Sequence, residues 1–114
     1  IPKDVFICDW HYERPDKTAV IFANKGLQVA TAPWRNATLT AAQTVDMADF
    51  RKNATPQVKE NYAGMLQTVW SPAVFFMREA YQTKNNKNFK GMGQWASFVA
   101  MSDKMKEIAE NGKL

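Results

Sequence analysis

The chain has 114 residues, of which 46% are hydrophobic, and a formal net charge of +4. This is enough material for one folded domain, and no apolar run approaches the roughly 20 residues of a membrane-spanning helix, so we expect no membrane span. The basic residues are dispersed, which argues against a nucleic-acid partner. A single cysteine and a single histidine exclude an internal disulfide framework and the usual metal-ligand clusters, so we expect neither metal nor cofactor.

The first segments of the chain predict a strand, a helix and a second strand. Residues 4–10 form a nearly continuous apolar run, typical of a strand covered on both faces, and we expect Cys8 to be packed within it. Residues 18–26 predict a short helix with Gly26 as its carboxyl-terminal cap. Residues 27–31 resume strand character, and the strand ends near Pro33, because proline has no N–H for a ladder.

The second half of the chain continues the alternation of helix and strand. Apolar residues at helical spacing follow the second strand, and a serine and a proline precede a later helix in the places where both are favoured. The expected elements are, in chain order, a helix from Thr38 or Thr40 to about residue 52, a strand over 63–70, a helix over 71–82 and a C-terminal helix over 90–112.

This order predicts an α/β fold with parallel strands joined by right-handed crossovers. Three such strands make a poor free-standing protein, because the outer two present unpaired backbone edges. A complete barrel of this type typically needs about 250 residues. We therefore predict that residues 1–114 are a single partial domain, with strand-helix units over 2–82, and that the rest of a larger barrel or another chain completes it.

Each predicted strand delivers a tryptophan near its carboxyl end, namely Trp10, Trp34 and Trp70. Ligands of α/β folds bind at this edge, and an indole can stack on the C–H face of a sugar while its N–H meets a hydroxyl. Burial in the core is the alternative for each tryptophan. Arg35 and Asn36 follow Trp34 at the strand exit, where they either hydrogen-bond a ligand or belong to the start of the next helix.

Residues 9–12 divide into two sets, because side chains alternate along a strand. Asp9 and His11 face one side, and Trp10 and Tyr12 face the other. In the favoured orientation Trp10 and Tyr12 contact the ligand, and Asp9 orients the His11 imidazole as a structural pair. In the other orientation Asp9 and His11 act as acid and base. Only one set can face the ligand.

Three stretches of the chain carry a resemblance to a known family. PKDVFICDWHYE, FANKGLQVATAPWRN and NYAGMLQTVWSPAVFFMREAY resemble the last three strand-helix units of the catalytic barrel in family 20 glycoside hydrolases, the β-N-acetylhexosaminidases and their bacterial relatives. The likeness covers residues 2–82. It rests on an apolar run that ends on Trp10, on a Lys-Gly step before Val29, and on the pattern from Gly64 to Trp70.

The resemblance implies strands 6 to 8 of a (β/α)8 barrel in a secreted or periplasmic glycosidase. The tryptophans would wall a pocket for a terminal N-acetylhexosamine. Such enzymes work by substrate assistance, and their catalytic Asp-Glu pair lies on the fourth strand, outside this chain. The chain alone is therefore expected to be inactive and to hold no catalytic residue. It also has Ser71-Pro72 where family members usually carry a glutamate.

The predicted role is thus to supply walls of a sugar pocket, and the alternative is a non-catalytic carbohydrate-binding or interaction module. Asp9 and His11 are expected to support the strand end. The predicted sugar contacts are Trp10, Tyr12, Trp34, Arg35, Asn36 and Trp70.

Overall fold

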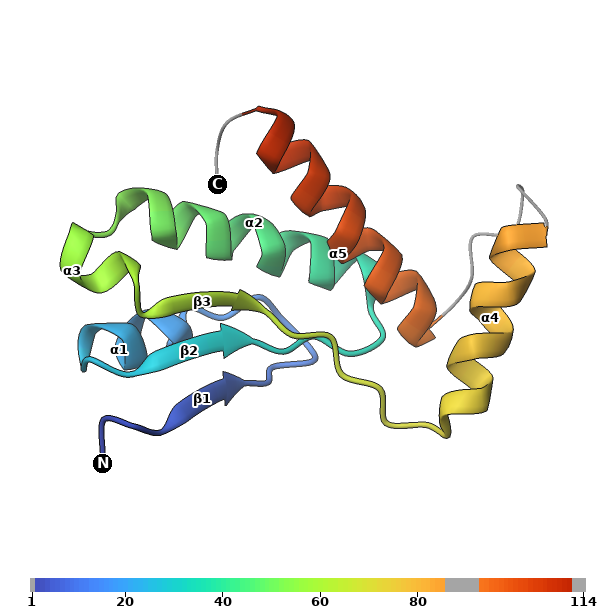
Figure 1. The fold of residues 1–114 in the computed structure, drawn as a ribbon, viewed down its shortest axis with the longest axis horizontal. Helices are drawn as coiled ribbons and strands as arrows, with labels where there is room; N and C mark the ends of the chain where they lie inside the picture. Colours follow the sequence, from blue (N-terminus) through green and yellow to red (C-terminus); the bar gives the residue numbers. More distant parts are fainter. Residues whose placement is uncertain (1, 86–92, 112–114) are drawn as a thin grey trace.

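The computed structural model describes residues 2–85 and 93–111 and has a mixed α/β architecture. Its sheet has three strands in the order β1-β2-β3, with both pairings parallel, which confirms the predicted α/β class (Figure 1). The elements are β1 (Phe6–Asp9), α1 (Thr18–Asn24), β2 (Gln28–Thr31), α2 (Ala37–Asn53), α3 (Pro56–Lys59), β3 (Tyr62–Met65), α4 (Ala73–Asn85) and α5 (Gly93–Glu110).

The strands are shorter than expected, and the predicted strand over 63–70 is wrong beyond Met65. After β3 the chain keeps contact with the segment following β2 through isolated bonds, from Leu66 N to Thr31 O at 2.9 Å and from Thr68 N to Pro33 O at 3.0 Å. Pro33 has a carbonyl but no N–H, so the ladder cannot continue past it. The tryptophan of the third unit therefore lies on a loop rather than at the strand end.

The helices follow the predicted order with one addition. The short helix α3 was not predicted, and Pro56 stands at its start, where proline costs no helical hydrogen bond. Helix α5 spans the central part of the expected segment 90–112, of which residues 90–92 and 112 lie outside the described residues.

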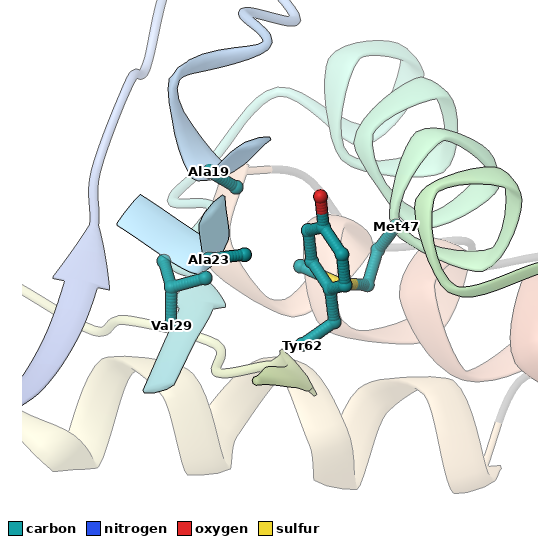
Figure 2. Packing of buried hydrophobic residues seen from close by; sticks show 5 residues of the cluster. All are labelled: Ala19, Ala23, Val29, Met47 and Tyr62. Carbon is teal, nitrogen blue, oxygen red and sulfur yellow. The ribbon is translucent and has the colours of Figure 1, made fainter. Parts of the chain in front are cut away.

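The core lies on one face of the sheet, between the strands and helices α1 and α2. Figure 2 shows Val29 and Tyr62 from the strands meeting Ala19 and Ala23 of α1 and Met47 of α2. All five are at most 3% exposed. The two alanines let α1 approach the sheet closely, because their side chains add little thickness between the layers.

The opposite face of β1 is open, which corrects two expectations about this strand. Phe6 is 48% exposed and the Cys8 thiol is exposed, so the strand is covered on one face only and the cysteine is not packed. The strands add to the sheet in sequence order, and right-handed crossovers then place both connecting helices on the same face. The apolar composition of a strand shows that its residues are hydrophobic, but it does not show which face of the strand the helices cover.

Helices α4 and α5 form the outer part of the structure. Helix α5 packs along α2, with Met101 and Ile108 buried. Helix α4 lies beyond the carboxyl ends of the strands (Figure 1) and meets α5 through Phe76, whose ring centroid is 5.2 Å from that of Trp95 and 5.9 Å from that of Phe98. The first turn of α5 is thereby held next to the loops that follow β2 and β3.

Gly26 closes helix α1 with a positive φ of 83°. Its N–H donates to Ala23 O at 3.0 Å, and the next N–H, of Leu27, donates to Phe22 O at 3.1 Å. We expect Gly26→Ala to lower the free energy of unfolding by about 1 kcal/mol, because an L side chain is strained at this φ. The cause is not crowding, since the nearest atom to an added Cβ is Lys3 Nζ at 3.6 Å.

Urea unfolding measures this loss, and Gly26→Asn is the matched variant. Asparagine tolerates positive φ better than alanine does, so its loss should be smaller. Equal losses for the two variants would contradict a backbone cause.

Candidate functional site

Four aromatic side chains gather where the three strands end. The Tyr12 ring lies at the centre, with its centroid 5.4 Å from that of Trp10 and 5.3 Å from that of Trp34. The indole N–H of Trp70 donates to the Tyr12 hydroxyl at 2.7 Å. We call Trp10, Tyr12, Trp34 and Trp70 the aromatic cluster. The structure thus brings all three predicted strand-end tryptophans together around one tyrosine.

Two members of the aromatic cluster are strongly exposed. Trp10 is 64% exposed and Trp70 is 68% exposed, whereas Tyr12 and Trp34 are half-buried. Burial in the core therefore does not describe Trp10 and Trp70. Exposed aromatic rings grouped on one surface are typical of an interaction or ligand site.

Two hydrogen-bond donors of the aromatic cluster, the Tyr12 O–H and the Trp10 N–H, are available to a ligand. The Tyr12 hydroxyl accepts from Trp70 Nε1, and its other neighbour, Thr68 Oγ1, is 3.5 Å away, so its own proton is left to donate. The Thr68 hydroxyl is itself bonded to Pro33 O at 2.7 Å. Within residues 2–85 and 93–111 the Trp10 indole N–H has no hydrogen-bond acceptor. A ligand stacked here would meet one O–H and one N–H donor.

Gln94, in the first turn of α5, ties two of the tryptophans together. Its side-chain oxygen accepts from the Trp34 indole N–H at 2.7 Å and from the Trp70 backbone N–H at 2.5 Å. Its amide nitrogen donates to Ser71 Oγ at 2.5 Å. Gln94 was not predicted as a site residue, because it lies 60 positions from Trp34 and a single glutamine at a helix start carries no motif. Only the path of α5 brings it to the site.

Arg35 and Asn36 are both engaged within the protein. The Arg35 guanidinium carbon lies 4.2 Å from the ring centroid of Trp34, a cation–π contact that covers one face of this indole. The Asn36 side-chain oxygen accepts from Leu39 N at 3.0 Å and caps helix α2. The capping alternative thus describes the Asn36 oxygen, and only its amide N–H2 group is left for a ligand.

We expect Asn36→Ala to lower the free energy of unfolding by about 1 kcal/mol, because the cap oxygen is lost. Asn36→Asp keeps an acceptor at the same position, close to the positive end of the helix dipole, and should keep the stability. Thermal or urea unfolding of the two variants checks this. Equal stability of Asn36→Ala and the parent chain would show that the cap does not contribute to the free energy of unfolding.

Asp9 and His11 form a polar network with the start of helix α1. The Asp9 carboxylate is 8% exposed; it accepts from Thr18 Oγ1 at 2.6 Å and lies 3.1 Å from His11 Nε2. The other imidazole nitrogen is 3.7 Å from Asp16 Oδ2, and the His11 carbonyl accepts from Gln43 Nε2 at 2.8 Å. His11 also borders the hollow that Trp10 and Tyr12 line.

Comparisons with known proteins add no identification. No protein-family model matches the chain, and no curated protein sequence matches it either. In the part of the chain that the structure describes, histidine, cysteine and acidic side chains nowhere form a group of three suited to a metal ion. No helix in that part is long and apolar enough to cross a membrane. The aromatic cluster is therefore the structural feature that points to a function.

Proposed function

We propose that this chain is the carboxyl-terminal part of a glycoside hydrolase barrel of the family 20 type and supplies aromatic walls of its sugar pocket. One observation carries the proposal: the aromatic cluster stands at the carboxyl ends of three parallel strands, the edge where barrel enzymes bind their substrates. Exposed indole faces suit the C–H faces of an N-acetylhexosamine.

The sheet topology supports the barrel part of the proposal. The strand order β1-β2-β3 shows no reversal, and both crossover helices contribute to the core on one face, whereas a doubly wound sheet reverses its order and is covered on both faces. Among the described residues β1 and β3 are each paired along one edge only. Further strands at these edges would continue the sheet toward closure and cover the exposed Phe6 and Cys8 from the barrel interior.

In this proposal the chain binds the sugar but does not cleave it. Trp10 and Trp70 supply stacking faces, and the free Trp10 N–H and Tyr12 O–H meet hydroxyl or acetamido oxygens. Asp9 and His11 hold the end of β1 in place. The acid that protonates the leaving group belongs to another part of the barrel, and the parent protein would be a secreted or periplasmic hydrolase.

The second candidate is a non-catalytic carbohydrate-binding module, which the exposure of Trp10 and Trp70 supports equally well. The association state in solution separates the two. A barrel part with two unpaired strand edges should self-associate or require the remaining strands, whereas a module should sediment as a folded monomer. Sedimentation velocity of the 114-residue chain, combined with circular dichroism, makes this measurement.

Sugar binding is tested by titrating the chain with N-acetylglucosamine in a calorimeter. We expect weak, saturable binding, and we expect Trp70→Ala to lower the affinity about tenfold, since an aromatic stacking contact contributes about 1 kcal/mol or more. The melting temperature should hardly change, because Trp70 is 68% exposed. Tyr81→Ala, an equally exposed aromatic change on α4, is the control and should bind normally. No heat with the parent chain, together with a strong loss of stability in Trp70→Ala, would contradict the pocket.

A further inference from the structure

A second concave site lies between helices α1, α2 and α3. It is a groove of about 530 Å³, a volume within the range of small-molecule sites. We call it the helix groove. Val20, Phe50 and Val58 provide apolar walls, and none of its lining residues belongs to the aromatic cluster. The proposed sugar function does not use it.

The Tyr62 side chain forms the floor of the helix groove, and its hydroxyl opens on the groove. Tyr62 is 3% exposed, and its hydroxyl points away from β3 into the space between α1 and α2 (Figure 2). It makes no hydrogen bond to any residue of 2–85 or 93–111. Burial raises the pKa of this phenol, so the group stays neutral and can both donate and accept. The hydroxyl is therefore left for water or a ligand in the groove.

The rim of the helix groove is acidic. Asp46 and Asp49 stand three residues apart, and so share one face of α2, and both line the groove together with Lys17. Neither carboxylate lies in an ion pair with a described residue. Burial raises the pKa of Asp46, nearby Asp49 raises it further, and the charge of Lys17 opposes both. Two carboxylates against one ammonium leave the groove with an excess of negative charge.

We propose that the helix groove binds a small organic cation, an ammonium group on a short alkyl stem. The carboxylates of Asp46 and Asp49 neutralise the ammonium, and the apolar walls contact the stem. The Tyr62 hydroxyl gives the floor one polar atom for the ligand. Charge complementarity selects this class over a neutral or anionic molecule of the same size, because an anion would meet two carboxylates and only Lys17 in its favour.

The test compares two ligands with the same stem. The 114-residue chain is titrated at pH 7 with n-hexylamine, which is protonated, and with n-hexanol, which is neutral, and amide resonances are followed by NMR. We expect saturable shifts for residues 17–24 and 46–58 with the amine, and at least tenfold weaker binding of the alcohol. Equal binding of amine and alcohol, or amine shifts spread over the whole chain, would overturn the proposal.

Two rim variants are expected to change the affinity for the amine in opposite directions, and a third removes the Tyr62 hydroxyl. Asp46→Asn should weaken amine binding about fivefold and Lys17→Gln should strengthen it severalfold, since each changes one charge at the rim. Tyr62→Phe should weaken it about threefold through loss of one hydrogen bond. Asp103→Asn, an exposed change on α5, is the control and should bind as the parent does.

Asp46→Asn and Lys17→Gln decide the outcome if Tyr62→Phe proves unstable, because neither Asp46 nor Lys17 belongs to the core cluster. Unchanged affinity in both of these rim variants would refute the proposal.

Discussion

Replacing Ser97 by leucine is expected to lower the free energy of unfolding by about 3 kcal/mol, the sum of a lost buried hydrogen bond and the cost of overpacking. Ser97 is 0% exposed. Its hydroxyl lies 2.6 Å from Thr40 Oγ1 on α2 and donates to Gln67 Oε1 at 3.0 Å. A leucine here has no room between α2 and α5 and leaves the Gln67 oxygen without its donor.

Two serine variants on the same helix separate these causes. Ser97→Ala removes only the hydroxyl, and the Thr40 proton then has a second acceptor at Asn36 O, 2.9 Å away, so we expect a loss of about 1 kcal/mol. Ser102→Ala, also on α5 but only half-buried, should change stability little. Urea unfolding measures all three. Similar stabilities of Ser97→Leu and Ser97→Ala would show that the helices tolerate the added volume.

The Ser97 contact also reaches the candidate site. Gln67, which accepts from Ser97, donates through its side-chain nitrogen to the Trp34 carbonyl at 2.6 Å. The backbone of Trp34, one of the predicted sugar contacts, is therefore held in place by Gln67, which is itself bonded to Ser97 of α5. Damage to the packing of α5 on α2 should alter the aromatic cluster even though no aromatic residue is changed.

The sequence predicted elements well where one local pattern decides them. A helix was expected over 90–112, and α5 spans Gly93–Glu110 within it, because apolar residues recur at helical spacing along this stretch. The parallel strands followed from alternation with helices. The end of β3 was missed, because it depends on Pro33 of a neighbouring strand exit rather than on residues 63–70. The exposure of Cys8 was missed, because coverage of a strand is decided by helices elsewhere in the chain.

In the candidate site, too, local features were predicted and long-range contacts were not. Strand order alone was enough to expect Trp10, Trp34 and Trp70 near one another. Their mutual arrangement depends on hydrogen bonds across long sequence separations, from Trp70 to Tyr12 and from Gln94 to both loops. Such bonds leave no spacing pattern in a single sequence. The partner of a polar side chain can be predicted only when it lies within a turn or a helix cap, as at Asn36.

Replacing Gln94 by methionine is expected to weaken sugar binding about tenfold if the aromatic cluster is the sugar wall. Methionine keeps the length of the side chain but has no strong acceptor, so the indole N–H of Trp34 and the backbone N–H of Trp70 both lose their shared partner. Stability should fall by about 1 kcal/mol, because water can replace part of these bonds at a half-buried position. The larger effect is on orientation, since the two tryptophan loops are no longer tied to α5.

Gln94→Glu is the matched variant, because a carboxylate oxygen can accept from the same two N–H groups. The Trp34 indole N–H resonance should move upfield in Gln94→Met and stay downfield in Gln94→Glu, whereas Gln57→Met, an exposed change on α3, should leave it in place. This readout needs no sugar. A shifted resonance in a chain whose parent shows no sugar binding would keep Gln94 as the residue that positions Trp34 and reject the sugar pocket. An unshifted resonance in Gln94→Met would reject the bond itself, because the indole proton cannot lose a 2.7 Å acceptor without a change in its shielding.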